Sequence, residues 1–238
     1  ALVMHPAYKF AMLGSVTTPD TASRTASHTV LLDVDGTLID SFPGIRAGFV
    51  RALEAVGATL PSEEFIARIP GPPMPESMEA AGLNADEIAR AMPVYMDYME
   101  RQGWREFTVF PGIAALIQRW KEAGLMVVTA TSKSERFARL ALDSAGILPS
   151  IDFLGAADHD RGRSTKVDVL QHVIASVHPQ GPLMVGDRIH DYEGAAEFGI
   201  PSVAATWGYG DPAEWSKATY TARDTDELEV IVNNHVRT

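Results

Sequence analysis

The sequence predicts an α/β fold in which a parallel sheet carries an inserted helical segment. Two observations lead to this prediction. From residue 110 onward, short apolar runs alternate with segments of helical periodicity, a pattern typical of parallel βα units with right-handed crossovers. Residues 42–108, by contrast, are rich in helical periodicity alone. We therefore expect a core formed by residues 30–41 and 109–238, with a helical insert between its two parts.

The first core strand is predicted in the run VLLDVDGTLIDS, which extends from Val30 to Ser41. Buried parallel strands are near-continuous apolar runs, and their chemistry lies at their carboxyl ends. Asp33 and Asp35 follow this run directly, and Gly36 follows them. Two carboxylates this close repel each other unless a metal ion or a shared proton compensates. An Asp-rich turn bent by Gly36 is the structural alternative, but stability alone explains the pair poorly.

Residues 1–29 show no periodicity, and Ser, Thr, Ala and Pro dominate them between Ser15 and His28. Such a composition buries too little apolar surface to offset the entropy of ordering. We expect a flexible N-terminal extension that carries no chemistry.

Four helices are predicted in the insert. The first has Pro43 in its opening turn, where proline is favoured, and apolar residues at three- and four-residue spacing from Ile45 to Val56. The segment ARIPGPPMPES is too rich in proline and glycine for regular structure, and Pro93 is expected to kink or restart the last helix. The other three helices are predicted at 62–69, 76–81 and 85–102.

Strands and helices are expected to alternate in the second part of the core. The helix in PGIAALIQRWKEAG precedes the strand run LMVVTAT, which ends at Thr131, and the run PLMVGDRIHD ends at Asp191. Further strands are predicted near 151–154 and in PSVAAT, and further helices at 134–145, 166–177 and 192–198.

Four motifs occur in a fixed order along the chain. They are DxDGT from Asp33, a run ending in Thr131 and Ser132, Lys166 at a helix start, and GDRxxD with Asp187 and Asp191. In this order they resemble the haloacid dehalogenase (HAD) superfamily. TSK at 131–133, GPPM at 71–74, STKVDVL at 164–170 and WGYG at 207–210 resemble its phosphoglycolate phosphatase and 5′-nucleotidase-like branch. The resemblance implies a Rossmann-like core and a small helical cap at 42–108.

The resemblance also implies roles for the acidic residues. Hydrolysis of a phosphate monoester needs an in-line nucleophile, an acid for the leaving oxygen and positive charge around the phosphoryl group. Asp33 is the expected nucleophile and forms an aspartyl-phosphate, while Asp35 acts as acid and then as base. Oxygen ligands suit Mg²⁺, and by resemblance these are the Asp33 side chain, the Asp35 carbonyl and Asp187, with Asp191 in support. An aspartate after a strand can also merely cap the next helix.

The positive groups are easy to survey because the chain has five lysines. Lys166 matches the phosphate-binding lysine of the family and would neutralise the phosphoryl oxygens, which Thr131 and Ser132 would help to bind. Lys133 follows these hydroxyls, so a substrate-facing role and an exposed position at a helix start both stay open. His190 is expected to face solvent. The three remaining lysines, expected to be solvated, are Lys9, Lys121 and Lys217.

Residue types that are missing from the predicted cap disfavour several related reactions. Residues 42–108 contain no lysine, so a Schiff-base phosphonatase mechanism lacks its amine there. By resemblance, a second acid at Asp35 disfavours dehalogenation, which needs neither that acid nor a metal. The cap also lacks histidine, which weakens a phosphomutase reading. Arg68, beside the GPPM loop, is our first choice for a residue that meets a second anionic group of the substrate and sets specificity.

Composition excludes several classes of partner. With 46% hydrophobic residues among 238, the chain can bury one sizeable core and a small second one. It has no cysteine, which excludes disulfides and thiolate sites. A net charge of -11 argues against nucleic acid and anionic membranes as partners. No apolar run approaches the roughly 18 residues of a membrane span, and the first residues are unlike a signal peptide, so we expect a cytoplasmic protein.

These features together predict a Mg²⁺-dependent phosphomonoester hydrolase acting on a small phosphorylated metabolite. Phosphoglycolate and nucleoside monophosphates are the leading candidates. The main alternative is a phosphotransferase that passes the phosphoryl group from the aspartate to a sugar or protein hydroxyl. A non-catalytic phospholigand-binding module would keep the fold, but it would not need both Asp33 and Asp35. Nothing in the sequence supports a protein substrate.

Overall fold

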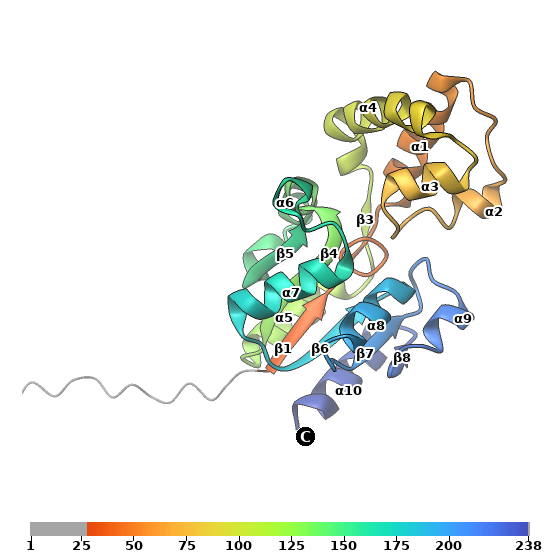
Figure 1. Cartoon of the computed structure of the whole chain (residues 1–238). Helices are drawn as coiled ribbons and strands as arrows, with labels where there is room; N and C mark the ends of the chain where they lie inside the picture. The colour runs from red at the N-terminus through yellow and green to blue at the C-terminus, as the bar shows by residue number, and fades with distance from the viewer. Residues whose placement is uncertain (1–27, 238) are drawn as a thin grey trace, which may run out of the picture.

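A six-stranded parallel sheet forms the centre of the core in the computed structural model, which describes residues 28–237 (Figure 1). The strand order is β5-β4-β1-β6-β7-β8. Strand β1 therefore lies between β4 and β6, and the carboxyl ends of these three strands meet at one edge. The predicted fold class is confirmed. The strands are β1 (His28–Leu32), β4 (Met126–Ser134), β5 (Phe153–Ala157), β6 (Gln180–Gly186), β7 (Ser202–Ala205) and β8 (Tyr220–Ala222).

Helices cover both faces of the sheet, which explains why β1 is apolar at successive positions. Val30 and Leu32 pack into a cluster with α5 (Ile113–Glu122), α6 (Glu135–Ser144) and α10 (Thr225–Val236). Leu31 packs on the opposite face with α7 (Lys166–Val177) and α8 (Ile189–Ala196). Burial of each such side chain stabilises the fold by about 1.5–3 kcal/mol. The strand that carries Asp33 is thus held from both sides.

The cap is a separate helical unit beyond the carboxyl edge of the sheet, drawn in orange and yellow in Figure 1. Its main contact is between α1 (Phe42–Val56) and α4 (Ala85–Arg101), and the shorter α2 (Glu63–Ile66) and α3 (Met74–Ala80) complete it. These helices enclose an apolar cluster of their own, distinct from the two clusters of the core. The cap side chains thus have support that does not depend on the sheet.

The two chain crossings between core and cap lie side by side. Strands β2 (Ile39–Asp40) and β3 (Thr108–Val109) pair antiparallel. The Tyr209 hydroxyl accepts hydrogen bonds from the backbone nitrogens of Ser41 at 2.8 Å and Phe42 at 3.0 Å, and donates to Asp40 Oδ1 at 2.9 Å. A core loop therefore clamps the point where the cap begins.

Several predicted boundaries need correction. Strand β1 begins at His28 rather than Val30, so only residues 1–27 of the expected flexible extension remain, and they lie outside the described residues. Helix α3 begins at Met74, inside the segment expected to be irregular, because prolines fit the first helical turn. Helix α4 runs through Pro93 without interruption. Helix α8 begins at Ile189, ahead of the predicted start at 192.

The end of the core holds elements that the sequence did not predict. They are β8, α10 and the short helix α9 (Pro212–Trp215). Three short 3₁₀ turns complete the described elements, namely η1 (Gly103–Arg105), η2 (Leu148–Ser150) and η3 (His159–Arg161). Within residues 28–237, none of the helices has the length and apolar character needed to cross a membrane.

Candidate active site

Asp33 lies directly after β1 and is 7% exposed. Its backbone nitrogen donates a hydrogen bond to Val185 O of β6 at 2.9 Å, so the strand pairing itself holds the residue in place. The chain then turns at Gly36, whose φ is 78°. A Cβ added there would lie 2.2 Å from Asp187 Oδ2. Glycine is therefore required for the turn to approach Asp187.

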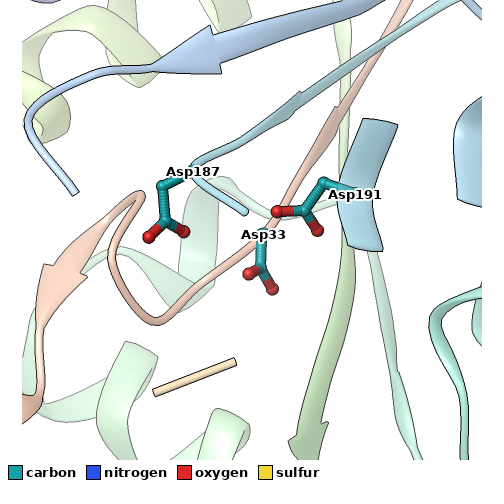
Figure 2. Close-up of side chains that lie close together, drawn as sticks. All are labelled: Asp33, Asp187 and Asp191. Atoms are coloured by element: carbon teal, nitrogen blue, oxygen red, sulfur yellow. The ribbon is translucent and has the colours of Figure 1, made fainter. Parts of the chain in front are cut away.

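Three buried carboxylates converge at this edge of the sheet, as Figure 2 shows. Oxygens of Asp33, Asp187 and Asp191 all lie within 4.8 Å of one another. Asp187 follows β6, and its two oxygens accept hydrogen bonds from Thr37 Oγ1 at 3.2 Å and from the backbone nitrogen of Tyr209 at 2.8 Å. Both bonds fix the orientation of this carboxylate.

Asp191 both caps a helix and belongs to the site. Its Oδ2 accepts a hydrogen bond from the backbone nitrogen of Arg188 at 3.0 Å, at the start of α8. Its Oδ1 lies 2.7 Å from Lys166 Nζ. One oxygen of Asp191 therefore completes the capping box of α8, while the other faces Lys166.

Lys166 is the first residue of α7, and a capping box between Thr165 and Asp168 fixes where this helix begins. The lysine is 6% exposed. Its Nζ donates to Ala130 O at 2.7 Å and lies 3.0 Å from Asp33 Oδ1. Burial disfavours the charge, but Asp191 and Asp33 outweigh it and raise the pKa of Lys166.

The three carboxylates of the site, when ionised, carry more negative charge than Lys166 alone offsets. Burial, partly offset by Lys166, raises the pKa of Asp33 to about 6. Burial and the neighbouring Asp191 and Asp33 carboxylates raise the pKa of Asp187 well above its usual value. Asp33 Oδ1 and Asp191 Oδ1 are buried without a well-directed hydrogen bond, although both lie near Lys166. Three carboxylates facing one ammonium form an oxygen donor set that fits a hard divalent ion such as Mg²⁺.

The polar residues after the LMVVTAT run lie on β4 beside Asp33. Thr131 is buried, and its Oγ1 accepts a hydrogen bond from the backbone nitrogen of Lys133 at 3.1 Å. Lys133 Nζ lies 2.9 and 3.0 Å from the two oxygens of Asp35, and its side chain is only 7% exposed. Lys133 is therefore not exposed at a helix start, and its ammonium contacts Asp35, while a substrate-facing role stays a prediction. His190 is exposed, as expected.

A cavity of about 380 Å³ lies between this cluster and the cap. Asp33, Asp35, Thr131, Ser132 and Lys133 line its core end. The opposite wall comes from the cap and from α6, and its side chains are almost all apolar. The apolar lining residues include Ile45, Ile69, Met74, Met92, Tyr95, Met96, Met99 and Phe137.

Arg68, the residue predicted to set specificity, lies outside the lining of the cavity. Its side chain is 63% exposed and pairs with Glu64 at 3.8 Å, and it is absent from the residues that line the cavity. The reason is that α2 ends at Ile66, so Arg68 sits in the following turn with its side chain directed to solvent. The role in specificity that the sequence suggested for Arg68 stays a prediction.

Arg188 joins the acidic cluster to the cap, a contact that the sequence did not predict. It is 8% exposed. Its guanidinium donates to Glu214 at 2.9 and 3.1 Å, and to the carbonyl oxygen of Pro70 in the cap loop. Its position beside Asp187 in GDRxxD was the one available signal. The loop that carries Asp187 thus also supports the proline-rich wall of the cavity.

Several known proteins resemble this chain. The PtkA tyrosine-protein kinase of Mycobacterium tuberculosis is 40% identical over 183 residues, which are 76% of this chain and 62% of that protein. The chain therefore spans less than two thirds of that relative. A 5′-nucleotidase of Pseudomonas aeruginosa is 27% identical over 87% of this chain and 96% of its own length.

A solved structure and a family model show the same relationship. The crystal structure of a predicted phosphatase from Clostridium acetobutylicum superposes with a TM-score of 0.81 and 30% identity, over 87% of this chain and 99% of that one. The model of the haloacid dehalogenase-like hydrolases matches residues 30–205. This chain, as its four motifs predicted, belongs to the haloacid dehalogenase-like hydrolase family.

Proposed function

We propose that this chain is a Mg²⁺-dependent phosphomonoester hydrolase that acts on a small phosphorylated metabolite through an aspartyl-phosphate intermediate. One observation carries the proposal. Asp33 lies at the bottom of a cavity, 3.0 Å from Lys166 and within 4.8 Å of two further buried carboxylates, and Asp35 lines the same cavity. A cytoplasmic location and the absence of nucleic-acid and membrane partners remain part of the proposal.

The residues of the chain divide the reaction into two halves. In the first, an oxygen of Asp33 bonds to phosphorus while the bond from phosphorus to the leaving oxygen breaks. Asp35 gives that oxygen a proton, so an alcohol departs. In the second, water bonds to phosphorus, Asp35 takes its proton, and the Asp33–phosphorus link breaks. Inorganic phosphate leaves, and the Asp33 carboxylate is restored.

Binding groups surround the transferred phosphoryl group in this proposal. Lys166, Thr131 and Ser132 would bind its oxygens. Asp33, Asp187 and Asp191, with the backbone carbonyl of Asp35, would hold Mg²⁺. When bound, this ion supplies positive charge that lets an anionic nucleophile approach an anionic phosphate.

Metal removal and trapping test the proposal. EDTA should abolish phosphate release from a panel of phosphomonoesters, and Mg²⁺ should restore it. Acid quenching with a ³²P-labelled substrate should leave label on the wild-type protein but none on Asp33→Asn. The surface variant Asp143→Asn should behave as wild type. Full activity in EDTA would contradict the metal site, and label on Asp33→Asn would contradict the nucleophile.

The similarity to PtkA favours one second candidate, transfer of the phosphoryl group to a protein hydroxyl. Such a reaction would use the same Asp33 and Lys166 but would replace water by an acceptor in the second half. The two candidates differ in products. Incubation with a labelled phosphodonor and an acceptor protein should give labelled inorganic phosphate if the chain is a hydrolase. Label that accumulates on tyrosine would favour the transferase.

A further inference from the structure

The wall of the cavity opposite Asp33 has a definite chemical character. Four methionines, Met74, Met92, Met96 and Met99, line it. Tyr95 and Phe137 add aromatic rings to the same wall. Ligand sites hold the bulk of a ligand with apolar side chains and orient it with a few polar groups. In this cavity the polar groups are concentrated at the core end, around Asp33, where the phosphate of a substrate would bind.

Cationic side chains are scarce around the cavity. Among the described residues that line it, the basic ones are Lys133 and His159, and no arginine is present. Lys133 contacts both oxygens of Asp35. His159 is exposed and pairs with Ser164 Oγ at 2.9 Å. A carboxylate on the leaving group would therefore lose water without gaining a free cationic partner, which is costly.

Tyr95 marks the boundary between the two ends. Its ring lines the cavity together with Met92 and Met96, and an ordinary phenol is neutral at neutral pH. Methionine side chains are flexible and make favourable contacts with aromatic rings. A flat apolar group would thus find adaptable contacts on this wall.

We propose that the cavity selects phosphomonoesters whose leaving group is uncharged and apolar, in particular an aromatic ring, over those that carry a carboxylate or a sugar. The proposal rests on the hydrolase function above and names its substrate class. It replaces phosphoglycolate and nucleoside monophosphates as leading candidates. The ring could belong to a free metabolite or to a protein side chain, and the two sources share this chemistry.

A matched pair of substrates tests the selection. Benzyl phosphate and 2-phosphoglycolate both release an alcohol, and they differ in a phenyl group against a carboxylate. With Mg²⁺ present, kcat/KM for benzyl phosphate should exceed that for 2-phosphoglycolate and for AMP by about tenfold or more. Equal values, or a preference for either polar substrate, would overturn the proposal. A phosphotyrosyl peptide as a further substrate separates a protein source from a free metabolite.

Variants at Met96 test whether the wall causes the preference. Met96 is 37% exposed, so a polar side chain can be placed there without burying it. Met96→Lys should shift the ratio of kcat/KM toward 2-phosphoglycolate by about tenfold. Met96→Gln, which is of similar length but neutral, should leave this ratio unchanged. Ala89→Lys should also leave it unchanged, because it adds the charge at an exposed position of α4 outside the cavity. An equal shift in all three variants would overturn the assignment to this wall.

Binding without turnover keeps the test independent of the hydrolase proposal. Benzylphosphonate and phosphonoacetate carry the same two groups but cannot be hydrolysed. Calorimetry on the Mg²⁺-loaded protein should give a lower Kd for benzylphosphonate by about tenfold. Tight binding of benzylphosphonate without hydrolysis of any phosphate ester would contradict the hydrolase and support the apolar site. Tighter binding of phosphonoacetate would overturn the apolar site even if hydrolysis occurs.

Discussion

The core end and the cap end of the cavity differ in what holds their side chains. At the core end, the ionisable side chains of Asp33, Asp187 and Lys166 are almost fully buried, and each residue is fixed by hydrogen bonds at a strand or helix terminus. At the cap end, methionines project from helices that have an apolar cluster of their own. The proposed reaction and the proposed choice of substrate would thus depend on side chains that are held in place separately. A rigid ionic centre suits the transfer step, and an adaptable apolar wall suits recognition.

The largest expected effect is at the core end. Asp33→Asn should lower kcat by at least about a thousandfold on every substrate, because an amide is a far weaker nucleophile. The ratio of kcat/KM between benzyl phosphate and 2-phosphoglycolate should stay unchanged in any residual activity. Steady-state kinetics on rigorously purified protein measures both. A changed ratio would show that the two ends are not independent.

Arg188, which contacts both ends, should give an intermediate effect. Arg188→Met removes the support of the Pro70 carbonyl, so the cap loop should lose its position and KM should rise about tenfold, more than kcat falls. Arg119→Met is the matched control, since Arg119 makes a comparable two-point pair with Glu229 on the exposed surface, at 2.8 Å in both contacts. Loss of thermal stability without a change in KM would assign Arg188 a structural role alone.

The buried carboxylates of the core end should also affect how the thermal stability of the protein depends on pH. The raised pKa values of Asp187 and Asp33 mean that the metal-free folded state favours their protonated forms. The stability that proton binding gives the folded state is fully present below about pH 4. It is lost as the pH rises through the raised pKa values, of which that of Asp33 is about 6. Asp187→Asn removes one charge, so in EDTA it should raise Tm by a few degrees at pH 8 and by less at pH 5.

Scanning fluorimetry with and without Mg²⁺ checks this prediction. In Mg²⁺ the order should reverse, because the wild type gains stability from a ligand that the variant binds poorly. Asp143→Asn, an exposed change on α6, should leave Tm unchanged at both pH values. A lower Tm for Asp187→Asn in EDTA at pH 8 would mean that its hydrogen bonds outweigh the repulsion.

The smallest effect is expected at Arg68. Its side chain lies outside the cavity and is 63% exposed, so Arg68→Ala should change kcat/KM by less than about twofold on both benzyl phosphate and 2-phosphoglycolate. The same kinetic assays measure it. A tenfold loss confined to 2-phosphoglycolate would restore the specificity role that the sequence suggested, and would require the cap loop to rearrange when substrate binds.

The core end could be predicted from the sequence and the cap end could not. Asp33 and Asp187 follow apolar strand runs, and the geometry of a parallel sheet brings such positions to one edge. Lys133, which pairs with Asp35, lies where the register of β4 against β5 shifts, between Thr131 and Ser134, and no local pattern reveals such a shift. The exposed position of Arg68 was not foreseen, because α2 is one turn long instead of the expected two. The late strand β8 has three residues and too short an apolar run to be noticed.

The paired strands β2 and β3 have a consequence for how such a protein can change over time. They bring both ends of the cap segment to neighbouring positions on the core, so a segment of another length can replace it without stretching the sheet. Exchanging the gene segment that encodes the cap would transfer all four methionines of the cavity wall at once. Tyr209 would stay on the recipient core, where its hydroxyl accepts hydrogen bonds from the backbone nitrogens of Ser41 and Phe42 at the start of the cap. Enzyme engineers could therefore treat residues 42–107 as an interchangeable module, and new specificities could arise by recombination before any point mutation.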